Sequence, residues 1–442
     1  MNRPNILYLH SHDTGRYVQP YGHPVPTPNL QRFAEQGVLF RRAFCVAPTC
    51  SASRAGLLTG QSAHSSGMIG LAHRGFSLKD YKQHIVHTVR RAGYHSTLIG
   101  VQHVAKDPNI IGYDVIAQRK KPGDTGTVEA AAEFFNSAPR QPFFASVGFF
   151  LTHRKYPEPG PPEDPRYMMP PLPMPDTSET RYDTACFKAS ARMLDDAMGS
   201  VLKALDGSGL GENTLVICTT DHGIAWPYMK CNMTDNGAGV MLMMRWPGGG
   251  GRSGEGGFTG GRVIDALVSH IDVFPTVCEL VGVERPAWLQ GKSLMPLIRG
   301  ETDEVNEAVF IENTYHAAYE PMRAVRTKRW KYIRRFGGRG RPVLPNCDDS
   351  LSKTLWMKHG WADRPLAEEE LYDLVFDPVE MNNLAGEARA REALNEMRGR
   401  MDRWMKDTAD PLLGGEPVPA PPEAVVNDPD GISPQEKPRA AQ

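Results

Sequence analysis

The chain of 442 residues has a formal net charge of -1 at pH 7, with 40% hydrophobic and 23% charged residues. These values exclude a largely disordered chain, and the balanced charge argues against a general nucleic-acid binder. No apolar run approaches the roughly 18 residues of a membrane helix, so we expect neither a nucleic-acid nor a membrane partner.

The N-terminus and the cysteines bear on the compartment. The sequence passes from Met1 directly into an apolar stretch, without the basic and apolar regions of a secretory signal. Its seven cysteines are odd in number and lack zinc-type pair spacing, which favours free thiols. We therefore expect a cytoplasmic protein without a disulfide framework.

Short apolar runs alternate with helical patterns along the first part of the chain. Alternating strands and helices predict an α/β domain with a mostly parallel sheet and helices on both faces. In such sheets ligands bind beyond the carboxyl ends of the strands. Runs typical of buried parallel strands cover residues 5–10, 95–100, 142–150, 213–220 and 239–247, and helical patterns cover residues 29–37 and 184–209.

From residue 309 onward the pattern becomes that of antiparallel strands, followed by a charged helix at residues 390–407. We predict a large catalytic α/β domain over residues 1–308 and a smaller subdomain with an antiparallel sheet over residues 309–410. The proline-rich tail, residues 411–442, is expected to be unfolded or to form an arm on a partner subunit of a homo-oligomer.

Two polar clusters stand where predicted strands end. His12 and Asp13 follow the first strand, and Asp221 and His222 follow a later one. Oxygen and nitrogen ligands at strand ends suit a divalent cation. A strand-end Asp is also common as a turn or N-cap residue, and a lone His more often packs in a satisfied environment. Two such pairs beside a candidate reactive residue favour the metal site.

The stretch "APTCSASRAGLLTGQ" supplies that reactive residue, Cys50. A free cysteine is usually a small buried hydrophobe, and Arg54 by itself would be a surface charge. If Cys50 opens a helix, however, Arg54 lies on the same face, with its guanidinium next to the sulfur and the helix N-terminus favouring negative charge. This geometry predicts an anion site that contains a nucleophile.

The segment "CSASRAGLLTG" resembles the signature of the type I sulfatases, in which the Cys of a Cys-x-Pro-x-Arg motif is oxidised to Cα-formylglycine. The resemblance continues in the family's order through "PNILYLHSHDTGRYVQPYG", "NTLVICTTDHG", "HIDVFPTVCELVG" and "ELYDLVFDPVEMNNLA", nearly to residue 385. Within the family, "TGQSAHSSGMIGL", "PFFASVGFFLTHR" and "ENTYHAAYEPMRAVRT" are most similar to the heparan N-sulfatase (sulfamidase) branch, which acts on N-sulfated glucosamine.

The resemblance implies an alkaline-phosphatase-like α/β/α sandwich and hydrolysis of a sulfate ester or sulfamate of a small molecule or saccharide. It also implies a maturation enzyme that converts Cys50 to formylglycine, and a divalent ion, usually Ca2+. Hydrated formylglycine would attack the sulfur and then expel sulfate as the aldehyde re-forms. The implied metal ligands are Asp13, Asp221, His222 and residue 50, with His12 ranked below Asp13.

The resemblance assigns further roles within the site. Arg54 would hold the formylglycine oxygens and the metal ligands in place, and Lys230 would bind a sulfate oxygen. His103 and His153 match the family's substrate-side histidines, one near the nucleophile and the other protonating the leaving group. His316 is a candidate for substrate recognition.

Three positions depart from the family's pattern. Val101 stands where the family usually has a Lys that contacts both sulfate and nucleophile. His12 and Asp13 replace a pair of aspartates, which lowers the negative charge at the metal. Ala52 replaces the proline of the motif that the maturation enzyme reads.

Two alternatives stay open from the sequence. A phosphonate monoester hydrolase or phosphodiesterase of the same superfamily would use similar motifs, and Arg54 and Lys230 suit a tetrahedral oxyanion of either sulfur or phosphorus. A non-enzymatic, carbohydrate-binding descendant is conceivable because of Val101 and Ala52. The presence of the metal-site residues and both histidines weighs against the second alternative.

Overall fold

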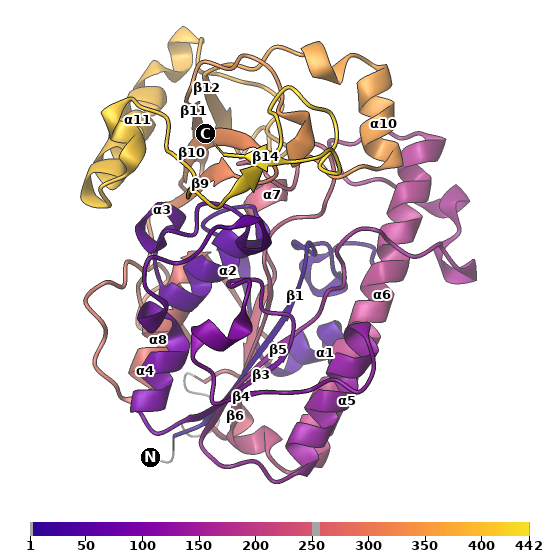
Figure 1. Cartoon of the computed structure of the whole chain (residues 1–442), viewed down its shortest axis with the longest axis vertical. Coiled ribbons are helices and arrows are strands. Elements are labelled where there is room, and N and C mark those ends of the chain that lie inside the picture. Colours follow the sequence, from indigo (N-terminus) through magenta and orange to yellow (C-terminus); the bar gives the residue numbers. More distant parts are fainter. Residues whose placement is uncertain (1–2, 250–256, 442) are drawn as a thin grey trace.

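The computed structural model describes residues 3–249 and 257–441 and contains two main sheets of unequal size (Figure 1). The strands are β1 (Asn5–Ser11), β2 (Val38–Phe44), β3 (His95–Gly100), β4 (Val115–Ile116), β5 (Phe143–Gly148), β6 (Thr214–Thr220), β7 (Leu242–Arg245), β8 (Arg262–Ser269), β9 (Val309–Tyr315), β10 (Tyr319–Arg326), β11 (Trp330–Arg335), β12 (Glu369–Asp373), β13 (Val425–Val426) and β14 (Arg439–Ala440). The large sheet has the order β4-β3-β5-β1-β6-β7-β2-β8, and the small one has the order β12-β11-β10-β9.

Helices cover both faces of the large sheet (Figure 1). They are α1 (Pro28–Gln36), α2 (Cys50–Thr59), α3 (Ala63–Ser66), α4 (Ile85–Arg91), α5 (Gly123–Asn136), α6 (Ser178–Gly207), α7 (Asp235–Ala238), α8 (Val273–Val281), α9 (Met295–Ile298), α10 (Leu351–Lys358) and α11 (Arg391–Asp407). Along β1, Ile6 and Tyr8 pack in the core under α2, α4 and α8, whereas Leu7 and Leu9 pack in the core under α1, α5 and α6. The predicted α/β arrangement is therefore confirmed.

The large sheet is mostly parallel, and β1 at its centre pairs in parallel with both β5 and β6. The run at residues 239–247, predicted as a parallel strand, is an exception, because β7 within it is antiparallel to β6 and β2. A parallel return needs a crossover, usually through a long helix, and only the short α7 lies between β6 and β7. Strand β2 was not predicted from the sequence because Arg41 and Arg42 interrupt its apolar run.

The small antiparallel sheet lies at the C-terminal end of the large one (Figure 1). Met322 and Ile333 from β10 and β11 join the same hydrophobic core as the large sheet. On the other face, Met397 and Met401 of α11 pack against the sheet in a second core. The smaller subdomain is thus held to the large sheet by shared apolar burial, which fixes the loops between them.

The last segment is not an unfolded tail, because residues 411–441 pack onto the body of the protein. Ala424 and Val426 are buried in a small apolar cluster with Phe76. The Asn427 backbone donates to the carbonyl of Ala317 at 2.7 Å. Two apolar anchors and backbone hydrogen bonds hold a stretch whose proline content alone predicted disorder.

The described helices and cysteines can be compared with what composition led us to expect. Across residues 3–249 and 257–441, every helix is too short or too polar to cross a membrane. All seven cysteines lie in this part of the chain, and each is buried and free. None of these cysteines is joined to another within the described residues.

Candidate active site

The two predicted polar pairs meet at one edge of the large sheet. Because β1 and β6 are adjacent and parallel, their carboxyl ends bring Asp13 and Asp221 together. The backbone N–H of Asp13 donates to Asp221 Oδ1 at 2.8 Å, and both carboxylates are buried. Although burial alone would raise the pKa of Asp221, His222 and Arg54 lower it well below its ordinary value. Both acids therefore stay ionised.

Imidazole nitrogens complete this cluster. His12 Nδ1 lies 3.1 Å from Asp221 Oδ2, and His222 Nε2 lies 3.3 Å from Asp13 Oδ1. His222 Nδ1 is 2.9 Å from the Gly223 carbonyl, so Nδ1 donates there and Nε2 is directed into the cluster. Burial lowers the pKa of His12 to about 4, which leaves this ring neutral at pH 7.

Cys50 is the first residue of α2, as the sequence predicted, and its thiol enters the same cluster. Its Sγ lies 3.3 Å from His222 Nε2 and 3.9 Å from Asp13 Oδ1. Burial raises the pKa of the Cys50 thiol well above its ordinary value, and the opposing effect of Lys230 does not reverse this. An unmodified Cys50 is thus a protonated thiol and a poor nucleophile.

The cluster fits a divalent cation. One ligand atom from each of His12, Asp13, Cys50 and Asp221 lies within 4.8 Å of the others. Within the described residues, His12 Nε2 is buried and has no hydrogen-bond partner, as expected of a nitrogen that ligates an ion. Carboxylate oxygens suit Ca2+, Mg2+ and Mn2+, and the imidazoles add affinity for transition metals.

Arg54 is buried, and its hydrogen bonds go to Asp221 and to the end of β1. Its guanidinium donates to Asp221 Oδ2 at 2.9 Å, to the Ser11 carbonyl at 2.7 Å and to His10 Nδ1 at 2.6 Å. No hydrogen bond joins it to Cys50 Sγ in the part of the chain that the structure describes. Arg54 therefore positions the Asp221 carboxylate and the end of β1, toward which the side chain turns from α2.

Lys230 lies between two carboxylates. Its Nζ is 2.9 Å from Asp13 Oδ2 and 2.9 Å from Asp348 Oδ2. Burial by itself would lower the pKa of Lys230, but these carboxylates raise it well above its ordinary value. A permanently charged, buried amine beside Cys50 suits the binding of an anionic oxygen.

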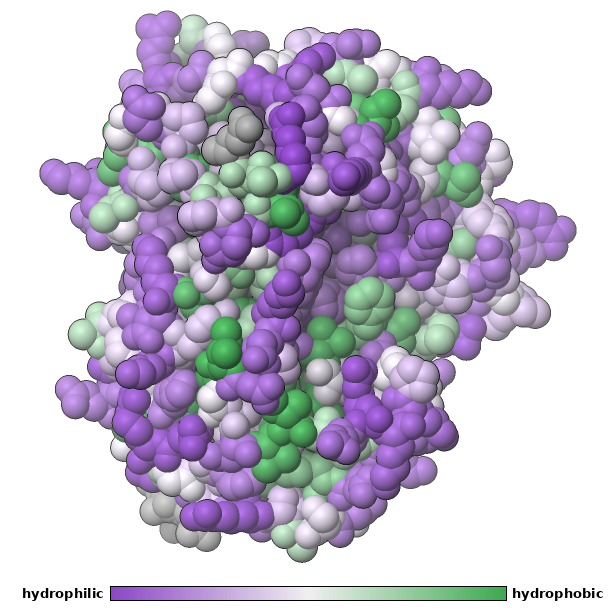
Figure 2. Space-filling view, in the orientation of Figure 1, coloured by the Kyte–Doolittle hydropathy of each residue, from purple (hydrophilic) through white to green (hydrophobic). Residues whose placement is uncertain are grey.

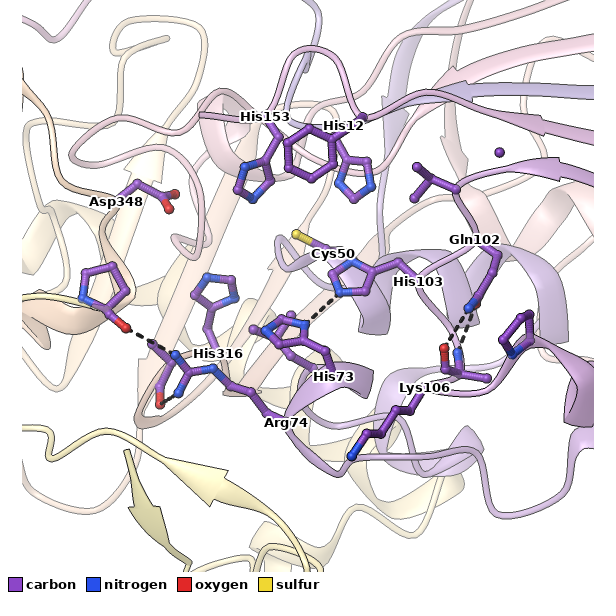
Figure 3. A pocket seen from close by; sticks show the side chains of 18 of the residues that line it. His12, Cys50, His73, Arg74, Gln102, His103, Lys106, His153, His316 and Asp348 are labelled. Carbon is purple, nitrogen blue, oxygen red and sulfur yellow. Dashed lines mark hydrogen bonds between the residues drawn. The ribbon is translucent and has the colours of Figure 1, made fainter. Parts of the chain in front are cut away.

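A pocket of about 680 Å³ opens over this cluster and is lined by all three predicted substrate-side histidines. His103 lies beside Cys50 and shares a hydrogen bond of 2.9 Å with His73 (Figure 3). His153 Nδ1 is 2.5 Å from the Arg154 carbonyl, which leaves Nε2 available to a substrate. Figure 2 shows the hollow between the N-terminal and C-terminal parts of the molecule, with hydrophilic side chains gathered around it.

His316 reaches the pocket from the end of β9, and its Nδ1 lies 2.6 Å from Thr49 Oγ1. Burial lowers the pKa of His316 well below its ordinary value, so the ring is neutral. Thr49 directly precedes Cys50, so this contact ties the C-terminal sheet to the start of α2. All ten residues that the sequence nominated thus lie in the cluster or line the pocket: His12, Asp13, Cys50, Arg54, His103, His153, Asp221, His222, Lys230 and His316.

Three residues in or next to this site have a strained backbone conformation. Asp13, His103 and Cys231 have φ angles of 49°, 58° and 64°, in the left-handed region that non-glycine residues rarely adopt. Each such residue costs on the order of 1 kcal/mol, which the surrounding structure has to offset. At these positions the surrounding packing holds the side chain in a direction that the backbone reaches only in an unfavourable conformation.

Several residues of the pocket were not predicted from the sequence. Asp348 contributes a carboxylate, and His73, Arg74 and Lys106 line the opposite side (Figure 3). None of them stands in a motif with metal-ligand or catalytic spacing. Asp348 lies on the loop before α10 and reaches the site only because the small sheet packs on the large one.

Comparisons with known proteins agree with this geometry. The human N-sulphoglucosamine sulphohydrolase is 27% identical over 469 residues, covering 92% of this chain and 91% of that protein. A solved structure of a protein in complex with its substrate D-glucosamine-2-N,6-O-disulfate superposes with a TM-score of 0.70, at 17% identity over 92% of this chain and 98% of the other. The phosphonate monoester hydrolase of Agrobacterium radiobacter has a TM-score of 0.71, at 21% identity over 92% of this chain and 96% of the other.

The structural similarities establish that the chain has the alkaline-phosphatase-like fold of these enzymes. A sequence model of the sulfatase family matches residues 4–283, which include β1, α2, β6 and the two polar pairs. With the fold, the buried carboxylates and the cysteine at the start of α2 in place, the chain belongs to the sulfatase family.

Proposed function

We propose that this sulfatase releases inorganic sulfate from a sulfate ester or sulfamate of a saccharide, with residue 50 matured to formylglycine. The observation that carries the proposal is the place of Cys50, whose Sγ lies 3.3 Å from His222 Nε2 inside a cluster of ionised carboxylates. As a thiol it is a poor nucleophile there, whereas an oxidised side chain at the same position would face both the cation site and the pocket. The name of the human relative supports a sulfated amino sugar.

Two groups complete the site in this proposal: formylglycine, made from Cys50 by a maturation enzyme, and a divalent cation, for which the sequence resemblance implies Ca2+. When present, they supply a hydroxyl nucleophile and positive charge for the sulfonate group. Asp13, Asp221, His12 and His222 are the residues that would hold the cation.

The chain's own residues perform the remaining tasks. Lys230 binds a sulfonate oxygen with its buried charge, and Arg54 keeps Asp221 in register with β1. His153 donates Nδ1–H to the Arg154 carbonyl, which directs Nε2 toward the pocket; the imidazolium form carries a second proton at Nε2 and delivers it to the leaving oxygen or nitrogen. His103 lies beside residue 50, where it orders the nucleophile.

A comparison of substrates tests the reaction. The protein from its native cell should hydrolyse an aryl sulfate with a higher kcat/KM than the matched aryl phosphonate monoester, and the Cys50→Ala variant should hydrolyse neither. A preference for the phosphonate would favour the alternative that the Agrobacterium radiobacter enzyme represents. Undiminished turnover by Cys50→Ala would exclude residue 50 as the source of the nucleophile.

A further inference from the structure

Positive charge is in excess in the active-site pocket. The whole chain has a net charge of -1, so it is not basic overall. The surplus of positive over negative residues in the pocket lining is therefore a local property. The cluster around Cys50 does not by itself explain it. The lining contains the cations Arg74, Lys106, Arg119 and Lys230 and the carboxylate Asp348.

The nearby carboxylates do not neutralise this surplus. Asp348 and the deeper Asp13 both pair with Lys230, each at 2.9 Å. The other deep carboxylate, Asp221, pairs with Arg54. Over residues 3–249 and 257–441, Arg74, Lys106 and Arg119 form no ion pair with any carboxylate. Their three charges are left to face whatever enters the pocket.

Arg74 is the most constrained of these cations. Its guanidinium donates to Asn427 Oδ1 at 2.6 Å, to the Pro434 carbonyl at 3.2 Å and to the Ala317 carbonyl at 3.4 Å. These acceptors fix the orientation of the guanidinium but carry no net charge. Burial accordingly lowers the pKa of Arg74 from its ordinary value, as expected for a partly buried cation without a counter-ion.

Arg74 and Lys106 lie away from the histidines that surround Cys50. In Figure 3, Arg74 and Lys106 are on one side of the pocket, and His12 and His153 are on the other, with Cys50 between them. A pocket of about 680 Å³ holds more than a sulfonate group and is in the range of sites that enclose a ligand of sugar size. A substrate with its sulfonate at Cys50 therefore reaches this second side.

We propose that Arg74, Lys106 and Arg119 form a second-anion subsite, which binds a carboxylate or a second sulfate carried by the substrate. This inference rests on the proposed function and narrows its substrate class to saccharides with at least two anionic groups. The planar guanidinium of Arg74 suits paired oxygens of either anion, and the two exposed cations add attraction over several ångströms. Uronic acids and multiply sulfated sugars both present such groups.

A binding experiment tests the subsite independently of turnover. The Cys50→Ala protein, which would not consume the ligand, is titrated by calorimetry with a sugar bearing one sulfate and with the same sugar bearing two. A third ligand replaces the second sulfate by a carboxylate, which distinguishes the two sources of the anion. The tested change is Lys106→Gln with Arg119→Gln, since neither side chain holds the fold together.

We expect the doubly charged sugars to bind about tenfold more tightly than the singly charged one, and the double variant to reduce that ratio to about twofold. Raising the salt concentration should reduce the ratio in the parent protein more than in the variant. Lys203→Gln, an exposed lysine on α6 outside the pocket, is the charge-matched control and should leave the ratio unchanged.

Other outcomes are equally informative. Equal affinity for singly and doubly charged sugars in the parent protein would overturn the subsite, as would equal loss of both ligands in the double variant. Arg74→Lys, which keeps the charge, should retain the ratio better than Arg74→Gln. Sulfate release by the unmutated enzyme is assayed separately, so a failed turnover would contradict the proposed function without deciding the binding result.

Discussion

Replacing Arg54 by Gln removes the cation that holds Asp221 and the end of β1 in place. Arg54 is 1% exposed and makes charged hydrogen bonds to Asp221 Oδ2 and the Ser11 carbonyl. Removing one partner of a buried pair costs about 3 to 5 kcal/mol, because the remaining charge and carbonyl stay buried. Asp221 keeps its bond from the Asp13 backbone, which favours the lower half of this range.

The assay has two readouts. For a chain of 442 residues, a loss of 3 to 5 kcal/mol lowers the thermal midpoint by about 3 to 5 °C. Calorimetric titration with Ca2+ should also show weaker binding, since Asp221 is no longer held toward the cluster. Both changes are predicted for Arg54→Gln.

Arg323 offers a matched control, because it is 0% exposed and pairs with Asp410 and Glu312 away from the cation site. Arg323→Gln should lose comparable stability and keep its cation affinity. The reasoning would be refuted if Arg54→Gln bound Ca2+ as tightly as the parent protein, or if Arg323→Gln lost affinity to the same extent.

Three further outcomes follow from individual residues. Burial lowers the pKa of His84, which caps α4, from 6.5 to about 3, so its stabilising contribution is present above pH 6.5 and is lost as the pH falls toward 3. His84→Asn keeps a capping acceptor, and its unfolding free energy should fall less steeply over that window; equal slopes in urea titrations would contradict this. Asp348→Asn frees charge on Lys230, so inorganic sulfate should inhibit about three- to tenfold more tightly, whereas an unchanged Ki would count against the pairing. Asp221→Ala should weaken Ca2+ binding by more than about 100-fold, and full occupancy by elemental analysis would exclude Asp221 as a ligand.

The strand ends explain why the centre of the site was predictable. The residues after a buried parallel strand meet those after its neighbour, so Asp13 and Asp221 could be placed together without coordinates. Cys50 at a helix start followed from the same local patterning. These predictions depend on sequence periods that act over a few residues.

Local sequence patterns do not predict contacts between residues that are far apart in the chain. Asp348 enters the pocket from the connection between β11 and β12 of the small sheet, and no local signal connects it with Lys230. The hydrogen-bond partners of Arg54 could not be predicted either, because spacing on a helix places a residue on a face and does not show which partner attracts its charge. The last segment folds through contacts with Phe76 and Ala317, far away in the chain.

The mass of the peptide that contains residue 50 is the most direct test of the central claim. In protein purified from its native cell, conversion of Cys50 to formylglycine should lower that mass by about 18 Da, and a hydrazide reagent should label the aldehyde. Ala52, next but one to Cys50, makes this measurement decisive for this chain. A peptide with an intact, alkylatable thiol in active enzyme would contradict the account.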